Sequence, residues 1–218
     1  MIVSPGRGYV FVHVPKTGGT SLALALETRA MKDDILIGDT PKARRRRGRL
    51  RGVTTAGRLW KHSRLADIDG LLPRQELDRL FVFTLVRNPW DRIVSYYHWL
   101  RVQSFDHPAV RLATGCEFSA FLNHPETRAS LARERYGDYV RGADGRERDA
   151  VFVRLEHLAG DLAPVEARLG LGLGLRLQVP HVNRSARPAD WRACYSPADA
   201  ALVGELCAED IARFGYLF

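Results

Sequence analysis

Apolar residues fall along the chain in short uninterrupted runs, and polar residues separate these runs. Three runs rich in Val, Leu and Phe cover residues 9–14, 80–86 and 150–155. Runs of this length without polar alternation are typical of strands that are buried on both faces, as in a parallel sheet covered by helices. The pattern therefore predicts three buried strands.

Helical signals occur between the predicted strands. The segment 21–30 is rich in Leu and Ala, which have high helix propensity. Asn88 as an N-cap before Pro89 predicts a helix that runs to about residue 102. Further helices are predicted at residues 74–79, 118–122, 126–134, 162–169, where Pro164 would fall in the first turn, and 198–213, where Ser196 and Pro197 mark the start and Gly215 the end.

Strands that alternate with helices indicate an α/β fold. We expect a single domain over residues 1–218, with a mainly parallel central sheet flanked by helices. In such sheets ligands bind at the carboxyl ends of the strands. Functional residues are therefore expected in the segments that follow the predicted strands.

Positive charge is concentrated in one segment. The chain has 33 Lys and Arg against 25 Asp and Glu, and ten of these cations but no carboxylate lie between residues 42 and 64. Residues 42–58 lack apolar periodicity and are predicted to form a basic mobile loop within the domain. The first interpretation of this composition is a solvated loop, and the second is a surface that attracts an anionic acceptor. Binding of nucleic acid or anionic lipid ranks third, because no aromatic residue interleaves the cations at 42–51.

Composition and motif spacing argue against several classes of protein. No run approaches 18 apolar residues, so no membrane span is expected. The N-terminus does not resemble a signal peptide, and the three cysteines are widely spaced, which favours a reducing compartment and a cytoplasmic location. No HExxH motif or cluster of His, Cys and carboxylates is present, and we expect no metal cofactor.

The segment after the first predicted strand has the composition of a phosphate- or sulfate-binding turn. It reads PKTGGTS, from Pro15 to Ser21. Its two glycines allow positive φ and a close approach to a ligand, and the following helix directs free amide groups toward an anion. Its lysine adds a mobile positive charge and its three hydroxyls add donors. The lysine precedes the glycines, so this is not the GxxxxGK[ST] loop, and an ordinary capped strand-to-helix connection would have a similar composition.

A second candidate anion site follows the second predicted strand. Arg87 comes directly after this strand, and Ser95 lies eight residues later, on the helix face of Asp91 and Trp99. The arginine fork suits a second phosphate, although a lone Arg often pairs with a carboxylate instead. Because both turns would lie at the same edge of a sheet, they predict a ligand with two anionic groups.

The two segments together carry a family resemblance. HVPKTGGTS and LVRNPWDRIVSYYHW resemble the two cofactor motifs of the sulfotransferases that use 3′-phosphoadenosine 5′-phosphosulfate (PAPS). VRLEHL, PHVNRS and the C-terminal segment are similar to the carbohydrate sulfotransferase branch and its short bacterial members. The resemblance covers most of the chain outside residues 32–60 and 103–148. It implies a P-loop-like turn and transfer of a sulfuryl group to an acceptor hydroxyl, as on a carbohydrate, with adenosine 3′,5′-bisphosphate (PAP) as the product.

The resemblance also implies roles for single residues. Arg87 and Ser95 would hold the 3′-phosphate, and Arg184 would contact a phosphate or be solvated. Lys16 would lie beside the bridging oxygen, where negative charge grows as the S–O bond breaks. The 5′-phosphosulfate would be held by the whole turn, that is by Pro15, Lys16, Thr17, Gly18, Gly19, Thr20 and Ser21.

An alcohol acceptor must lose its proton, so a general base is expected. His62 is our first candidate, because the carbohydrate branch has its base in a similar segment and because the flanking cations would keep the ring neutral. Glu156 is the alternative base, although with Arg154 it is predicted to lie on one face at the end of a strand and to orient substrate. His98 and His181 are weaker candidates, and a buried His13 is expected in the first strand.

Other functions remain open at this point. A small-molecule or nucleotide kinase would share the α/β scaffold, but the usual nucleotide loop and a magnesium carboxylate pair are missing. A non-catalytic module that binds anions or nucleic acid would bind without turnover. The aromatic residues Tyr96, Tyr97 and Trp99 could line a cleft, yet helical spacing of this kind more often indicates core. The acceptor and the oligomeric state cannot be derived from the sequence.

Overall fold

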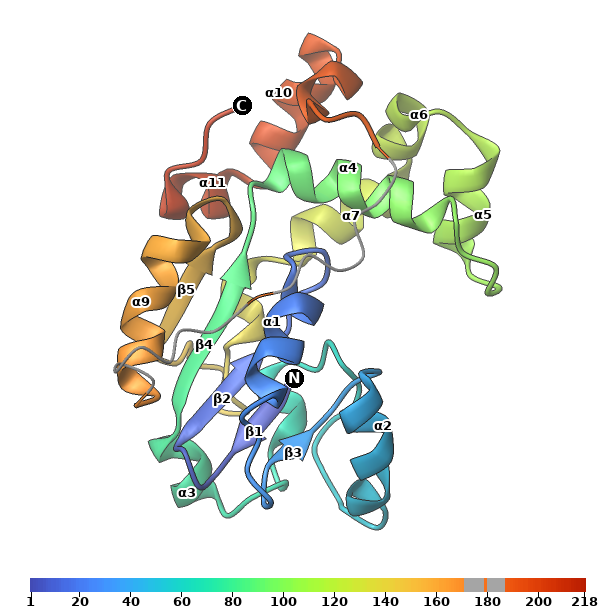
Figure 1. Ribbon diagram of the computed structural model, residues 1–218. Helices are drawn as coiled ribbons and strands as arrows, with labels where there is room; N and C mark the ends of the chain where they lie inside the picture. The colour runs from blue at the N-terminus through green and yellow to red at the C-terminus, as the bar shows by residue number, and fades with distance from the viewer. Residues whose placement is uncertain (171–178, 180–186) are drawn as a thin grey trace. The chain divides into compact units, whose positions relative to one another are not determined.

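The computed structural model describes residues 1–170, 179 and 187–218. The chain divides into two compact units, Met1–Val86 with Tyr136–Val182, and Arg87–Arg135 with Asn183–Phe218. Each unit is described by itself (Figure 1). A single domain over residues 1–218 stays a prediction.

The first unit contains a five-stranded sheet in the order β3-β1-β2-β4-β5. Strands β2, β4 and β5 are parallel, and β1 pairs antiparallel with both β2 and β3. The α/β class is therefore confirmed, and the sheet is mostly but not wholly parallel, because β1 and β3 add antiparallel pairs at one edge. The strands are β1 (Ile2–Ser4), β2 (Tyr9–Val12), β3 (Ile35–Leu36), β4 (Phe81–Val86) and β5 (Ala150–Arg154).

The three predicted buried strands are the three parallel ones. In their register Val12 pairs with Thr84, and Val86 pairs with Arg154. The hydroxyl of Thr84 is buried and donates to the carbonyl of Val12 at 2.7 Å, which satisfies a polar group inside the sheet. The carboxyl ends of β2, β4 and β5 consequently lie at one edge, as the α/β pattern predicts.

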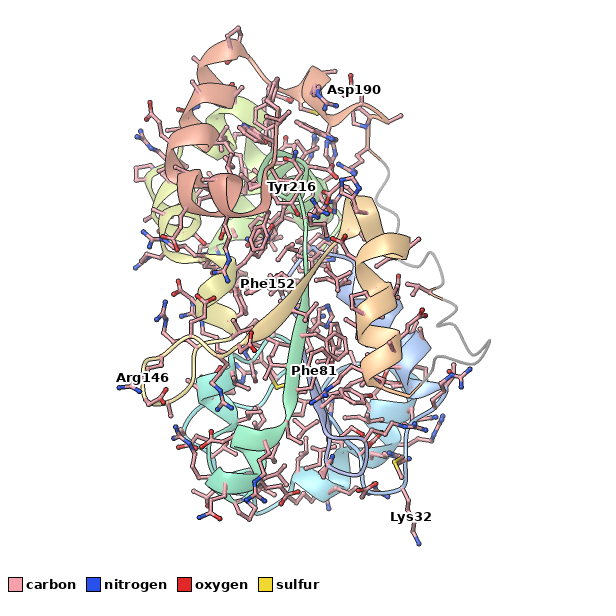
Figure 2. The ribbon with its side chains drawn as sticks, turned by 90° about the vertical axis from the view of Figure 1, so that its left-hand side faces the viewer. Lys32, Phe81, Arg146, Phe152, Asp190 and Tyr216 are labelled. Atoms are coloured by element: carbon pink, nitrogen blue, oxygen red, sulfur yellow. The ribbon has the colours of Figure 1, made fainter. Side chains whose placement is uncertain are left out.

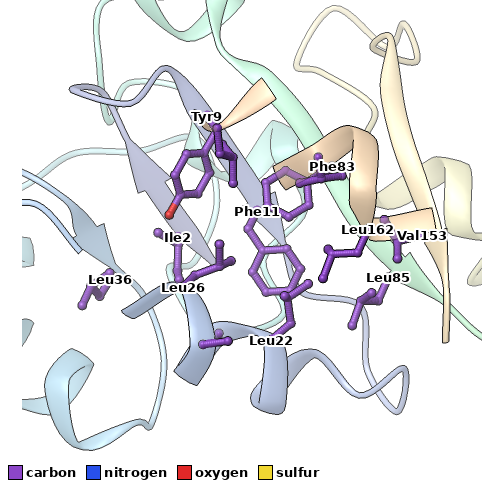
Figure 3. Close-up of a cluster of buried hydrophobic side chains, with 14 of the residues drawn as sticks. Ile2, Tyr9, Phe11, Leu22, Leu26, Leu36, Phe83, Leu85, Val153 and Leu162 are labelled. Atoms are coloured by element: carbon purple, nitrogen blue, oxygen red, sulfur yellow. The ribbon is translucent and has the colours of Figure 1, made fainter. Parts of the chain in front are cut away.

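Helices cover the sheet because apolar side chains from both form one core. Phe11 and Phe83 lie side by side on β2 and β4, with ring centroids 5.3 Å apart, and Leu22 of α1 and Leu162 of α9 pack in the same cluster (Figure 3). Full burial of one such side chain stabilises the fold by about 1.5–3 kcal/mol. The helices of this unit are α1 (Gly19–Glu27), α2 (Pro41–Arg46), α3 (Arg74–Arg79), α8 (Tyr136–Tyr139) and α9 (Leu158–Arg168), with 3-10 turns η1 (Arg47–Leu50), η2 (Leu65–Ile68) and η3 (Leu155–His157).

Strands β4 and β5 each carry a further, partly buried aromatic side chain. Phe81 begins β4 and Phe152 lies within β5 (Figure 2), and both are partly buried. Phe81 stacks on Phe83 at 5.7 Å, which continues the aromatic row of the core along β4. This row accounts for the aromatic residues of the run at 80–86, in which Thr84 is the one polar residue.

The second unit is helical in its described residues. Helix α4 (Pro89–Leu100) begins as predicted, since the side chain of Asn88 accepts a hydrogen bond from the amide of Trp90 at 3.1 Å. The remaining helices are α5 (Pro108–Gly115), α6 (Phe118–Asn123), α7 (Pro125–Arg133), α10 (Pro197–Leu206) and α11 (Ala208–Phe214), with a 3-10 turn η4 (Trp191–Cys194).

Three helix predictions need correction. The segment 42–58 is predicted to be a loop, but residues 42–50 lie in α2 and η1, where Thr40 caps α2 with its side chain and Pro41 occupies the first turn, and residues 51–58 have no helix or strand. Helix α9 begins at Leu158, so Pro164 lies inside the helix and not in its first turn. The last predicted helix is two helices, which separate at Cys207, where φ is −110° and ψ is 19°.

Candidate active site

The turn between β2 and α1 has an unusual backbone. Lys16 has φ of 65°, the one positive value at a non-glycine position among the described residues. Gly18 has φ of 85° and caps α1, and the hydroxyl of Thr17 is fully buried and donates to the carbonyl of Val14 at 2.9 Å. A left-handed non-glycine residue costs roughly 1–2 kcal/mol and is often found where function requires it. The predicted phosphate-binding turn is thus a tightly held, strained loop at the end of a strand.

Helix α1 begins at Gly19, which places Thr20 and Ser21 inside its first turn. The prediction began this helix at residue 21. The first amide groups of a helix lack intrahelical acceptors, and α1 has no acidic residue in its first turn. The N-terminus of α1 therefore presents donors and a positive dipole end in the segment predicted to bind an anion.

Close packing makes glycine necessary at both positions of the turn. A Cβ atom on Gly19 would lie 2.1 Å from Cδ2 of His13, and one on Gly18 would lie 2.9 Å from Cδ1 of Leu155. The His13 ring is buried and cannot move away without disturbing its neighbours. The two glycines thus give the turn its conformation and its close contact with the structure behind it.

His62 is joined to this turn through His13. The Nδ1 atom of His62 lies 2.8 Å from the carbonyl oxygen of His13, and the two rings are 4.6 Å apart. A carbonyl oxygen only accepts, so Nδ1 of His62 carries the proton and donates it. In the neutral ring the lone pair is then on Nε2. Burial, together with the neighbouring N-terminal amine and His62, lowers the pKa of His13 well below its usual value, and His13 stays uncharged.

The segment that carries His62 is held by Ser63. The hydroxyl of Ser63 is fully buried and contacts the carbonyls of Arg58 and Trp60 and the amide of Trp60, all at 2.9 Å. The ring of Trp60 meets that of His62 edge-on, with centroids 5.0 Å apart. Ser63 is not predictable from the sequence, because its role depends on contacts within a turn that has no sequence signature.

Glu156 lies on η3, directly after β5, and its side chain is exposed. The predicted pairing of Arg154 with Glu156 on one strand face is wrong, because the strand ends at Arg154. The guanidinium of Arg154 binds Asp161, at 2.8 and 3.1 Å, and this contact lowers the pKa of Asp161. Leu155, beside Glu156, contacts Gly18, so η3 lies near the glycine turn.

The second predicted motif lies in the other unit. Arg87 is only 8% exposed, and its Nε and Nη2 atoms both lie 2.7 Å from Oδ2 of Asp91. The other oxygen of Asp91 accepts a hydrogen bond from Arg187. Ser95 is buried one turn further along α4. Asp91 therefore fixes the guanidinium of Arg87, a role that the sequence analysis did not assign to it.

Among the remaining predicted residues, the structure describes Tyr97 and His98. Tyr97 is buried and its hydroxyl donates to the carbonyl of Cys116 at 2.9 Å, as expected for a core residue. His98 is half-buried, and burial lowers its pKa. Arg184 and His181 lie outside the described residues.

Comparison with known proteins identifies the family. The profile described as "Sulfotransferase family" matches residues 1–140, which is more than half of the chain. The chain belongs to the sulfotransferase family. The family expected from the sequence is thus confirmed, and with it a transferase that moves sulfuryl groups. No curated protein sequence matches the chain significantly.

A solved structure agrees with the family at the level of the fold. The crystal structure of mouse sulfotransferase SULT7A1 complexed with PAP is 17% identical to this sulfotransferase. The match covers 94% of this chain and 84% of the mouse chain, with a TM-score of 0.52. The carbohydrate branch is not selected by these matches and stays a prediction.

In the described part of the chain, no group of three or more His, Cys, Asp or Glu side chains could hold a metal ion. None of the described helices combines the length and the apolar composition that crossing a membrane requires.

Proposed function

We propose that this sulfotransferase transfers a sulfuryl group from PAPS to a hydroxyl of a carbohydrate acceptor. The observation that carries the proposal is the turn from Pro15 to Ser21, in which a strained Lys16 and a left-handed Gly18 precede the N-terminus of α1. Backbone amides, hydroxyls and one ammonium form a donor set that suits a phosphosulfate. The donor supplies the sulfuryl group, and the residues of the chain supply binding, charge stabilisation and proton transfer.

Lys16 is proposed to stabilise the negative charge left on the phosphate oxygen when the S–O bond breaks. A positive charge held in place before the reaction favours the transition state over the ground state, typically by several kcal/mol in a dry site. The positive φ of Lys16 supports this role, since a strained position is retained where the surrounding structure enforces it. Thr17, Gly18, Gly19, Thr20 and Ser21 would bind the same end of the donor.

His62 is proposed as the general base. Its Nδ1 atom is engaged by the carbonyl of His13, so the Nε2 atom of the neutral ring is the one that can accept the proton of the acceptor hydroxyl. The oxygen of that hydroxyl forms the new bond to sulfur as its own O–H bond breaks. Glu156 is the alternative base, and it lies exposed on η3, directly after β5.

Arg87 and Ser95 are proposed to bind the 3′-phosphate. Asp91 holds the guanidinium of Arg87 through its Nε and Nη2 atoms, which supports a fixed orientation for phosphate binding. Arg184 is proposed as a further phosphate contact on the basis of the PHVNRS motif alone.

The test is an assay with ³⁵S-labelled PAPS and a panel of neutral and anionic sugars, with PAP formation measured in parallel. We expect label in the sugar and PAP in equal amounts, and loss of both in Lys16→Ala. Transfer of the γ-phosphate of ATP to the same sugars, without use of PAPS, would contradict the proposal and favour a kinase.

A further inference from the structure

A pocket of about 670 Å³ lies within the first unit, between helix α2 with η1 on one side and the segment 51–61 on the other. It is separate from the glycine turn, and none of the residues assigned to donor binding lines it. Its size is that of a site for one small molecule. The pocket is formed by the basic segment that the proposed reaction does not use.

The charge of the pocket is strongly positive. Arg47, Arg51, Arg58 and Lys61 line it, against a single carboxylate, Asp39. Lys61 binds Asp39 at 3.0 Å and holds the pKa of that carboxyl below its usual value, and Arg47 lies 3.9 Å from it. Within the described residues no carboxylate lies within ion-pair distance of Arg51 or Arg58. Two guanidinium groups are therefore available for an anionic ligand.

An apolar wall lies beside these cations. Trp60 is 47% exposed and Val53 is 37% exposed, and both line the pocket together with Leu50 and Leu59. Exposed aromatic and aliphatic side chains next to guanidinium groups suit a ligand that has both a ring face and a negative charge. Such a ligand is smaller and more compact than a nucleic-acid strand.

The basic segment is anchored, which distinguishes it from a solvated loop. Arg46 donates to the carbonyl of Met31 at 2.8 Å, and Arg49 donates to that of Lys32 at 2.5 Å, while the side chain of Lys32 extends away from the ribbon (Figure 2). Lys42 is held by the carbonyl of Glu27. Several cations thus fasten α2 and η1 to the unit, and of the pocket-lining cations Arg51 and Arg58 remain for a ligand.

The pocket adjoins the proposed base. Trp60 and Lys61 line the pocket and immediately precede His62, and the rings of Trp60 and His62 are 5.0 Å apart. The Ser63 hydroxyl fixes this short segment, as described above. A molecule bound against Trp60 would therefore have its near end beside the ring of His62.

We propose that this pocket binds the acceptor, and that it selects hydroxyl compounds that carry a carboxylate or a sulfate next to a sugar or aromatic face. Arg51 and Arg58 bind the anionic group, and Trp60 packs against the ring. This inference rests on the proposed function and narrows its acceptor to an anionic class. A single-stranded nucleic acid would instead need a basic groove with aromatic side chains for successive bases, and Trp60 is the single aromatic residue among the described residues that line this pocket.

The experiment compares three acceptors that share one aromatic aglycone: p-nitrophenyl β-glucoside, its 6-sulfate, and p-nitrophenyl β-glucuronide. The variants are Arg51→Gln and Arg58→Gln, and the matched control is Arg45→Gln, an exposed cation of the same segment that does not line the pocket. We expect the wild type to prefer either anionic acceptor over the glucoside by about tenfold or more in kcat/KM, the equivalent of one charged hydrogen bond. That preference should fall about tenfold in each pocket variant and persist in Arg45→Gln. The relative rates of the 6-sulfate and the glucuronide distinguish sulfate from carboxylate.

Binding of the glucuronide, measured by calorimetry without PAPS, separates the two proposals. Binding that is lost in Arg51→Gln and Arg58→Gln, with no sulfuryl transfer to any sugar, would support the pocket and overturn the proposed function. Sulfuryl transfer at equal rates to neutral and anionic acceptors, unchanged in both variants, would overturn the pocket assignment alone. Displacement of the glucuronide by a short single-stranded oligonucleotide at lower concentration would also overturn it, in favour of a nucleic-acid surface.

Discussion

The substitution Gly19→Ala tests whether His13 connects the glycine turn to the proposed base. The added methyl group would lie 2.1 Å from Cδ2 and 2.5 Å from Nε2 of His13, whereas ordinary van der Waals contact begins at 3.4 Å. The ring would have to shift by about 1 Å, and it packs against His62 at 4.6 Å, so it has little space in which to move. Overpacking of this kind costs about 1–3 kcal/mol.

The expected result is a loss of both stability and turnover. For a chain of this size the loss of stability corresponds to a fall in Tm of about 2–4 °C per kcal/mol, measured by calorimetry. A displacement of about 1 Å at the base costs roughly a hundredfold in kcat. Gly160→Ala in α9 is the control, because a Cβ atom there has no neighbouring atom within 4 Å. We expect it to leave Tm unchanged or slightly raised.

A double-mutant cycle identifies the contact that is responsible. His13→Ala removes the ring that the new methyl group would meet, so Gly19→Ala should cost less stability in that background than in the wild type. Additive costs, or a Gly19→Ala variant that unfolds at the wild-type temperature and keeps its turnover, would refute the packing argument.

Three further predictions concern single side chains. Lys16→Ala should lower kcat by about 10²–10³-fold while PAP binding, measured by calorimetry, changes little, because the ammonium acts on charge that develops only in the transition state; an equal loss of binding and turnover would indicate a binding role. His62→Ala should lower kcat by about 10²–10⁴-fold and remove the acidic limb of the pH–rate profile, whereas Glu156→Gln should keep it; the reverse outcome transfers the role of base to Glu156. Asp161→Asn should cost about 1 kcal/mol of unfolding free energy at pH 7, since the Arg154 pair is partly exposed. Because Arg154 lowers the pKa of Asp161, the stabilisation is present above the ordinary carboxyl pKa of about 3.9 and is lost as the pH falls through the lowered pKa. The unfolding free energies of the two proteins, measured by chemical denaturation, should therefore converge in acid. A constant difference in unfolding free energy from pH 7 to pH 3 would show that the ion pair is not the source of the stabilisation.

The buried strands and the start of α4 could be predicted because their signals are local. The apolar runs gave β2, β4 and β5 to within two residues at each end, and Asn88 with Pro89 gave the first turn of α4. The strands β1 and β3 have only three and two residues. Strands this short have no recognisable period, and their antiparallel pairing is decided by tertiary contacts.

Charge composition misled the prediction for α2. The run of arginines suggested a loop, yet Thr40 and Pro41 are an ordinary N-cap and first-turn pair. Backbone carbonyls of Met31 and Lys32 accept hydrogen bonds from Arg46 and Arg49 and so hold two of the clustered guanidinium groups in place. Those acceptors are far away in sequence, so no local pattern indicates them.

The candidate site, too, has features with local sequence signals and features that depend on tertiary contacts. The composition of the glycine turn indicated an anion site, but the positive φ of Lys16 and the contact between Gly19 and His13 depend on packing. The bond from His62 to the carbonyl of His13 joins residues 49 positions apart, and only the folded chain brings them together. The family resemblance could therefore name His62 as a candidate without giving the tautomer that makes it a base.

The central claim is that the chain binds a doubly phosphorylated adenosine through the turn that contains Lys16. The most direct test is the shift in Tm caused by PAP compared with ATP at equal concentrations. At a hundred times its Kd, a ligand of the folded state adds about 2.7 kcal/mol of stability, which corresponds to about 5–10 °C here. We predict a shift of this size with PAP and a much smaller one with ATP, and an equal or larger shift with ATP would contradict the account.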